Sequence, residues 1–101
     1  MNKKNTQNFL EDLFLTIDNR AKSRSKLSYT KKLLRKGKNS IAQKYGEEST
    51  ELLIDYLNGT KKRTIEEAAD TIYHLLVLLY SKNISLKEIE KELIKRKKNV
   101  R

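Results

Sequence analysis

The chain, residues 1–101, carries 23 Lys and Arg against 13 Asp and Glu, which gives a formal net charge of +10. It has no Cys, which excludes a disulfide framework and a thiolate metal site. We find neither a secretion leader nor an apolar run of the roughly 18 residues that cross a membrane, so we expect a cytoplasmic protein with no membrane partner.

Long stretches of Leu, Ile, Lys and Glu without strand-like alternation predict a single all-α domain, a bundle of four to five helices. Phe9, Leu13 and Ile17 recur at helical spacing. A first amphipathic helix is therefore expected over about residues 6–21, with Thr6 as its N-cap.

The segment 22–27 is basic and Ser-rich, and without periodicity it is expected to form a loop near a bound anion. Ser28 can cap a short helix over residues 29–36. Gly37 ends that helix, because glycine tolerates positive φ.

The next helix, expected over about residues 39–57, carries acids beside its apolar face. On a helical wheel they form one stripe: Glu47, Glu48, Glu51 and Asp55. Gly46 lies inside this helix at a cost of roughly 1 kcal/mol relative to Ala. Either something approaches the backbone closely there, or the glycine relieves crowding between helices. Asn58 and Gly59 stop the helix.

The stretch Thr64–Glu67 has the pattern of a capping box and predicts a helix over about residues 65–81. Its second half, residues 72–80, is apolar nearly all round, so it needs cover on more than one side and predicts a homodimer. Asn83 is expected to take the left-handed position after this helix. A second capping box, Ser85–Glu88, begins the last amphipathic helix.

Two acidic pairs lie on these consecutive long helices at i, i+3 spacing: Glu48 with Glu51, and Glu67 with Asp70. A single such pair is usually a salt-bridged surface. Two pairs beside apolar residues could instead converge four oxygen ligands between antiparallel helices. Oxygen donors without His or Cys favour Mg²⁺, with Mn²⁺ as a substitute.

The net charge favours a polyanionic partner, which could be nucleic acid, a membrane surface or a phosphate-rich small molecule. Lys36 and Lys44 are candidates to hold phosphates. His74 lies one turn after Asp70, and we favour a core histidine hydrogen-bonded near Asp70 over a direct catalytic base.

Three stretches form a combined signature: Ser28-Tyr29-Thr30, then Ile41-Ala42-Gln43-Lys44-Tyr45-Gly46-Glu47-Glu48 with Glu51, then Glu67-Ala68-Ala69-Asp70 with Tyr73-His74-Leu75-Leu76-Val77-Leu78-Leu79. Over about residues 9–97 the chain resembles the phosphoribosyl-ATP pyrophosphatases of histidine biosynthesis. The acidic pattern alone is shared with the wider MazG-like all-α nucleotide pyrophosphohydrolases.

This resemblance implies Mg²⁺-dependent hydrolysis of phosphoribosyl-ATP to phosphoribosyl-AMP and pyrophosphate. It implies four metal ligands: Glu48, Glu51, Glu67 and Asp70. It makes Glu47 the candidate that orients or deprotonates the attacking water, or that holds a second ion. It places four residues around the substrate: Tyr29, Thr30, Lys36 and Lys44.

One departure concerns the phosphate contacts. Relatives commonly have a basic residue just before Ile41, where this chain has Ser40. That contact is therefore either missing or supplied by Lys38.

Three other functions are also compatible with the sequence. A house-cleaning pyrophosphatase would use the same metal ligands on other nucleoside triphosphates. A basic helical module could bind nucleic acid, although the acids lie where such a surface needs cations, so we expect no nucleic-acid partner. A purely structural dimerisation domain would leave the acids exposed.

Overall fold

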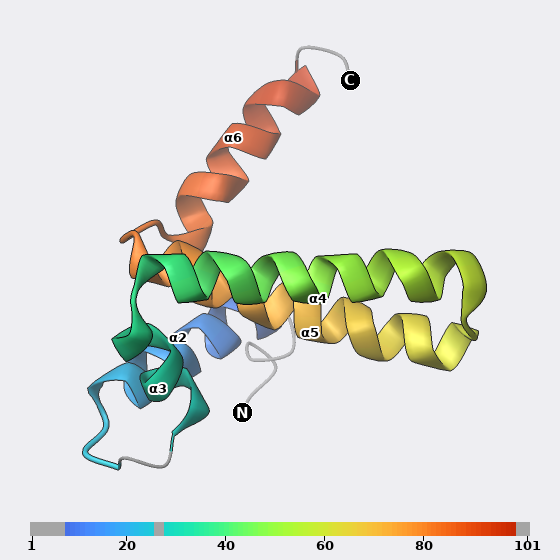
Figure 1. Cartoon of the computed structure of the whole chain (residues 1–101). Helices are drawn as coiled ribbons and strands as arrows, with labels where there is room; N and C mark the ends of the chain where they lie inside the picture. Colours follow the sequence, from blue (N-terminus) through green and yellow to red (C-terminus); the bar gives the residue numbers. More distant parts are fainter. Residues whose placement is uncertain (1–7, 26–27, 99–101) are drawn as a thin grey trace, which may run out of the picture.

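The computed structural model describes residues 8–25 and 28–98. Within these residues the chain forms five helices and no strand: α2 (Phe9–Lys22), α3 (Tyr29–Lys36), α4 (Lys38–Asn58), α5 (Lys61–Ser81) and α6 (Leu86–Lys98). The antiparallel hairpin of α4 and α5 is the longest unit, α2 and α3 pack at one end of it, and α6 projects away from it (Figure 1). The expected all-α class is confirmed. No described helix is long and apolar enough to cross a membrane.

The first two helices follow the sequence pattern closely. Ile17 on α2 is fully buried, as its place in the apolar stripe requires. The Ser28 hydroxyl caps α3 by accepting from the Lys31 backbone N–H at 3.2 Å, and Gly37 ends α3 at φ +96°. The predicted N-cap Thr6 lies outside the described residues.

The predicted start of α5 was wrong. The helix begins four residues earlier, at Lys61, and its cap is Thr60, whose hydroxyl accepts from the Arg63 backbone N–H at 3.1 Å. Thr64 lies inside the helix, where its hydroxyl donates to the carbonyl oxygens of Thr60 (2.9 Å) and Asp55 (3.1 Å). Because Gly59 and Thr60 alone reverse the chain, the basic run that follows is already helical.

The connection from α5 to α6 confirms both predicted caps. Asn83 has φ +61°, and the N–H groups of Asn83 and Ile84 donate to the carbonyls of Tyr80 and Leu79, both at 3.0 Å, as in a Schellman motif. The Ser85 N–H donates to the Glu88 carboxylate at 2.8 Å, and the Glu88 N–H donates to the Ser85 hydroxyl at 3.3 Å. These bonds fix the angle at which α6 leaves the hairpin.

The apolar core lies at the end of the hairpin where α2 and α3 pack. Its buried members come from four helices: Ile17, Leu33, Ile41, Leu76 and Val77. The other half of the hairpin, near its turn, has no described helix packed over it (Figure 1). Five large apolar residues in this half are exposed, and a sixth, Ile72, lies just beyond the middle of α5. The six are called the distal hairpin face below: Leu53, Ile54, Tyr56, Leu57, Ile65 and Ile72.

Gly46 lies in the middle of α4 on an exposed surface, and a Cβ added there meets no described atom within 4 Å. No described residue therefore makes the close approach that the sequence suggested. We expect Gly46→Ala to raise the free energy of unfolding by roughly 0.5–1 kcal/mol, because Ala loses less backbone entropy in a helix. Urea denaturation measures this.

Gly59→Ala is the matched control, because its Cβ would lie 2.6 Å from the Asp55 side chain and 2.9 Å from the Asp55 carbonyl oxygen. This variant is expected to lose stability. A loss in Gly46→Ala as well would mean that another molecule packs on α4 at that point.

Candidate active site

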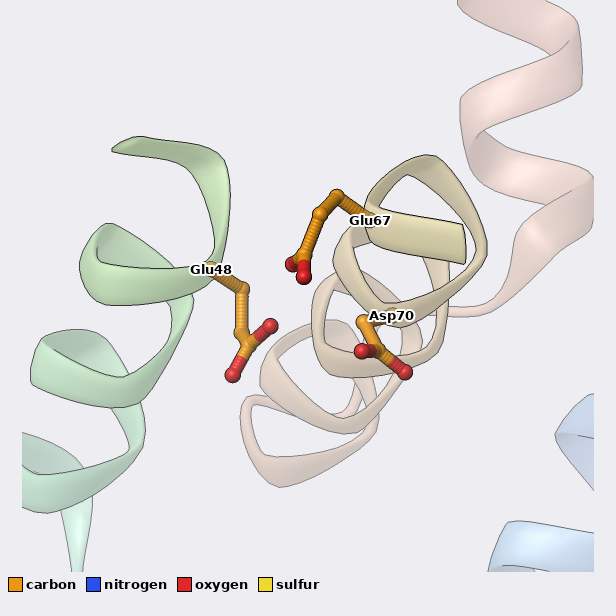
Figure 2. Close-up of side chains that lie close together, drawn as sticks. All are labelled: Glu48, Glu67 and Asp70. Atoms are coloured by element: carbon orange, nitrogen blue, oxygen red, sulfur yellow. The ribbon is translucent and has the colours of Figure 1, made fainter. Parts of the chain in front are cut away.

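Three carboxylates converge between the two long helices. Glu48 comes from α4, and Glu67 and Asp70 come from α5; one oxygen of each lies within 4.8 Å of the others. Figure 2 shows the Glu48 and Glu67 side chains turned into the space between the helices, with Asp70 beside them. Glu48 and Glu67 are each 7% exposed, whereas Asp70 is open to solvent. We call these three residues the acidic cluster.

Thr71 holds the two helices together at the level of the acidic cluster. Its buried hydroxyl lies 2.8 Å from the carbonyl oxygen of Glu67 and 3.2 Å from that of Glu48. The bond to the Glu48 carbonyl crosses from α5 to α4. It thereby fixes the relative height of the two buried carboxylates.

Each buried carboxylate has one paired oxygen and one unpaired oxygen. Lys44 contacts Glu48 Oε2 at 3.2 Å, and Arg63 contacts Glu67 Oε2 at 3.5 Å. Among the residues that the structure describes, Glu48 Oε1 and Glu67 Oε1 are buried without a hydrogen-bond partner. Unpaired buried carboxylate oxygens are costly, and an all-oxygen donor set of this kind fits a hard divalent cation.

The electrostatics of the acidic cluster also fit a cation. Burial raises the pKa of Glu67, and the nearby carboxylates of Glu51, Glu48 and Asp70 raise it further. The hydrogen bond to Glu48 raises the pKa of Lys44, so this ammonium stays charged. Lys44 and Arg63 bring two positive charges to three carboxylates, so they offset only part of the negative charge gathered here.

The fourth predicted ligand, Glu51, lies at the edge of the acidic cluster. It is exposed on α4, one turn after Glu48, and its negative charge helps to raise the pKa of Glu67. Glu51 is not one of the three residues whose oxygens lie within 4.8 Å of one another. The structure thus brings three of the four predicted ligands together and places Glu51 beside them.

A basic pocket of about 370 Å³ lies next to the acidic cluster, between α3 and α4. We call it the lysine pocket; its lining includes Tyr29, Lys32, Lys36, Ser40, Lys44 and Glu47. Lys44 lines the lysine pocket and also contacts Glu48, so this one side chain connects the pocket to the acidic cluster. Glu47 is exposed, and its carboxylate accepts from the Gln43 amide at 3.1 Å.

Among the predicted substrate residues, Tyr29, Lys36 and Lys44 line the lysine pocket, but Thr30 does not. Thr30 is 1% exposed, and its hydroxyl is hydrogen-bonded to the Tyr73 hydroxyl on α5. Sequence reasoning did not single out Lys32, although it lies one turn before Lys36 on the same face of α3. Lys38, the suggested replacement for the missing basic residue, is not part of the lining, whereas Lys32 is.

The predicted core position of His74 is confirmed. His74 is 7% exposed, and its Nδ1 atom lies 2.7 Å from the Asp70 backbone carbonyl oxygen. His74 therefore belongs to the packing beneath the acidic cluster, on the helix that carries two of its carboxylates.

Comparison with known proteins agrees with this geometry. Residues 10–97 match the model of the phosphoribosyl-ATP pyrophosphohydrolase family. The chain belongs to this family. Phosphoribosyl-ATP pyrophosphatase of Bacillus cytotoxicus is 49% identical over 87 residues, 86% of this chain and 81% of the relative. The Sulfolobus acidocaldarius protein of the same name is 42% identical over 93 residues, 92% of this chain and 98% of the relative.

A further relative carries the family domain as part of a longer chain. Histidine biosynthesis bifunctional protein HisIE of Staphylococcus aureus is 41% identical over 87 residues, which are 86% of this chain but 41% of that protein. Both relatives named phosphoribosyl-ATP pyrophosphatase match over most of their own length.

Proposed function

We propose that this chain hydrolyses the α–β phosphoanhydride of phosphoribosyl-ATP, giving phosphoribosyl-AMP and pyrophosphate in histidine biosynthesis. The observation that carries the proposal is the acidic cluster, with two unpaired buried carboxylate oxygens, directly beside the lysine pocket. A triphosphate needs both parts, because cations must offset its charge and fixed groups must orient it. Because the chain belongs to this family, we take phosphoribosyl-ATP as its substrate.

We assign the residues as follows. Glu48, Glu67 and Asp70 hold Mg²⁺, or Mn²⁺ in its place, with Glu51 as the fourth ligand. When bound, the divalent ion offsets charge on the phosphate oxygens. Lys36 and Lys44 hold phosphate oxygens, and Lys32 adds a third ammonium to the same pocket. Glu47, at the rim of the pocket, accepts the proton of the attacking water. Thr30 acts indirectly, by holding α3 against α5 through Tyr73.

The direct test is the release of pyrophosphate from phosphoribosyl-ATP with Mg²⁺, with Mn²⁺ and with a chelator. We expect turnover with either ion and none with the chelator. A panel of ordinary and noncanonical nucleoside triphosphates is the comparison. Equal or faster turnover of that panel would favour the house-cleaning activity, and salt-dependent duplex binding without any hydrolysis would favour a nucleic-acid module.

The distal hairpin face supports a homodimer as part of the same proposal. Six large apolar side chains there are exposed in the single chain. Exposed apolar patches commonly mark protein–protein contacts. A second copy of the chain presents the same two helices and can cover this face in an isologous contact. The cytoplasmic location stays a prediction from the sequence.

Mg²⁺ should stabilise the protein more at about pH 7 than at about pH 5. Because burial and neighbouring carboxylates raise the pKa of Glu67, the folded metal-free protein binds protons more tightly than the unfolded chain. Its contribution to stability therefore falls as the pH rises through that window. A divalent ion favours the ionised carboxylates, so its effect grows over the same window.

Melting curves with Mg²⁺, compared with NaCl at equal ionic strength, measure this effect. The Mg²⁺-induced shift in Tm should increase with pH. A shift that is the same at both pH values would place the bound ion away from Glu67.

A further inference from the structure

His74 bridges the helix of the acidic cluster and the wall of the lysine pocket. Its Nδ1 lies 2.7 Å from the Asp70 carbonyl oxygen, and its Nε2 lies 2.8 Å from the Tyr29 hydroxyl oxygen. A carbonyl oxygen only accepts hydrogen bonds, so Nδ1 carries the ring proton. In the neutral ring Nε2 is then an acceptor, and the Tyr29 hydroxyl donates to it.

Tyr29 has one anchored end and one free side. Tyr29 is 48% exposed and lines the lysine pocket, while its hydroxyl reaches the buried imidazole. The two rings meet edge to face, with centroids 5.7 Å apart. His74 itself does not line the pocket. Its contact with the pocket is therefore made through Tyr29.

A second bond joins the same two helical turns. The Thr30 hydroxyl is hydrogen-bonded to the Tyr73 hydroxyl, so neighbouring residues of α3 are attached to neighbouring residues of α5. If the bond from Tyr29 to His74 is cut, Thr30 still holds the helix. The ring of Tyr29 can then rotate without loss of the fold.

We propose that His74 is a positioning residue that fixes the Tyr29 ring as a wall of the substrate site, at a set height relative to the acidic cluster. This inference rests on the proposed function, because it gives the lysine pocket the role of the substrate site. In this role His74 does not accept or donate a proton in the reaction. We call the hydrogen bond between the Tyr29 hydroxyl and His74 Nε2 the tie. Loss of the tie should weaken substrate binding in the ground state and the transition state alike, which raises KM and leaves kcat nearly unchanged.

The first test is spectroscopic and does not depend on activity. His74 is the sole histidine in the sequence, so the imidazole nitrogen spectrum of untagged, ¹⁵N-labelled protein has one ring to assign. We expect the tautomer protonated at Nδ1, with a shift of the Nε2 resonance in Tyr29→Phe. A ring protonated at Nε2 alone, or an Nε2 resonance that Tyr29→Phe does not move, would overturn the proposal.

The second test is a double-mutant cycle on phosphoribosyl-ATP hydrolysis. Tyr29→Phe and His74→Leu should each raise KM about tenfold with kcat within about twofold, and the double variant should be no worse than either by more than about twofold. Mg²⁺ affinity, measured by calorimetry, should stay unchanged in all three. His74→Gln keeps an acceptor for Tyr29 and should recover most of the loss in KM.

The alternatives give different results. Additive effects in the double variant would indicate a packing role, and a large fall in kcat for His74→Leu alone would indicate a catalytic base; either would overturn the proposal. If the wild-type protein released no pyrophosphate, the proposed function would fail, while the nitrogen spectrum would still report on the tie. If His74→Leu does not fold, the spectrum of Tyr29→Phe and the kinetics of His74→Gln decide the matter.

Discussion

Glu67→Gln should reduce Mg²⁺-dependent hydrolysis of phosphoribosyl-ATP by at least about a hundredfold. The amide has nearly the same shape as the carboxylate but lacks its charge, and Glu67 Oε1 is one of the two buried oxygens without a partner. Calorimetry should show a matching loss of Mg²⁺ affinity. The fold should survive, because the raised pKa of Glu67 shows that the ionised side chain is unfavourable in the metal-free protein.

Glu66→Gln is the matched control for this variant. Glu66 also contacts Arg63, at 3.7 Å, but its side chain is 48% exposed and it is not part of the acidic cluster. Glu66→Gln removes an ion pair with Arg63 but no proposed metal ligand, so it distinguishes the effects of these two losses. Glu66→Gln should retain activity within about twofold, because exposed ion pairs contribute little. Equal losses in both variants would contradict the assignment of Glu67.

The acidic cluster could be predicted from the sequence because helical spacing fixes which residues share a face. Glu67 and Asp70 at i, i+3 lie on one side of α5, and a two-residue turn returns the chain beside Glu48. The position of Glu51 could not be predicted to the same accuracy. Glu51 lies on the exposed side of α4. How close its carboxylate comes to Glu67 depends on the packing of α4 against α5.

The start of α5 shows where local pattern failed. Both Thr60 and Thr64 are acceptable caps, and the acids after Thr64 gave it the stronger sequence pattern. The chain reverses within Gly59 and Thr60, and this short turn makes Thr60 the residue that caps α5. The geometry of the turn depends on both helices. The sequence pattern at the start of α5 alone therefore does not show which threonine caps the helix.

The tie between Tyr29 and His74 was outside the reach of sequence reasoning for a different reason. The two residues are 45 positions apart, and neither has a periodic relation to the other. Sequence alone placed Tyr29 near the substrate by resemblance, and it placed His74 in the core near Asp70 because the two residues are one helical turn apart. Their contact depends on how α3 packs across α5, which is a property of the assembled bundle.

Leu57→Lys should convert the protein from dimer to monomer at micromolar concentration. Leu57 is 73% exposed on the distal hairpin face, with Leu53 one turn before it, 60% exposed. If a second copy covers this face, a lysine there removes an apolar anchor and buries an unpaired charge. Such central interface positions are typically worth about 2–4 kcal/mol, or roughly thirty- to a thousandfold in dissociation constant.

Sedimentation velocity over a concentration series measures the dissociation constant of the dimer, with Leu15→Lys as the matched control. Leu15 is 57% exposed on α2, outside the distal hairpin face, so the same change of residue and charge there should leave the dimer intact. Because the acidic cluster lies within one hairpin, the Leu57→Lys monomer should still bind Mg²⁺. A wild-type chain that stays monomeric at every concentration, or a dimer lost in Leu15→Lys and kept in Leu57→Lys, would show that the distal hairpin face is not the contact between copies.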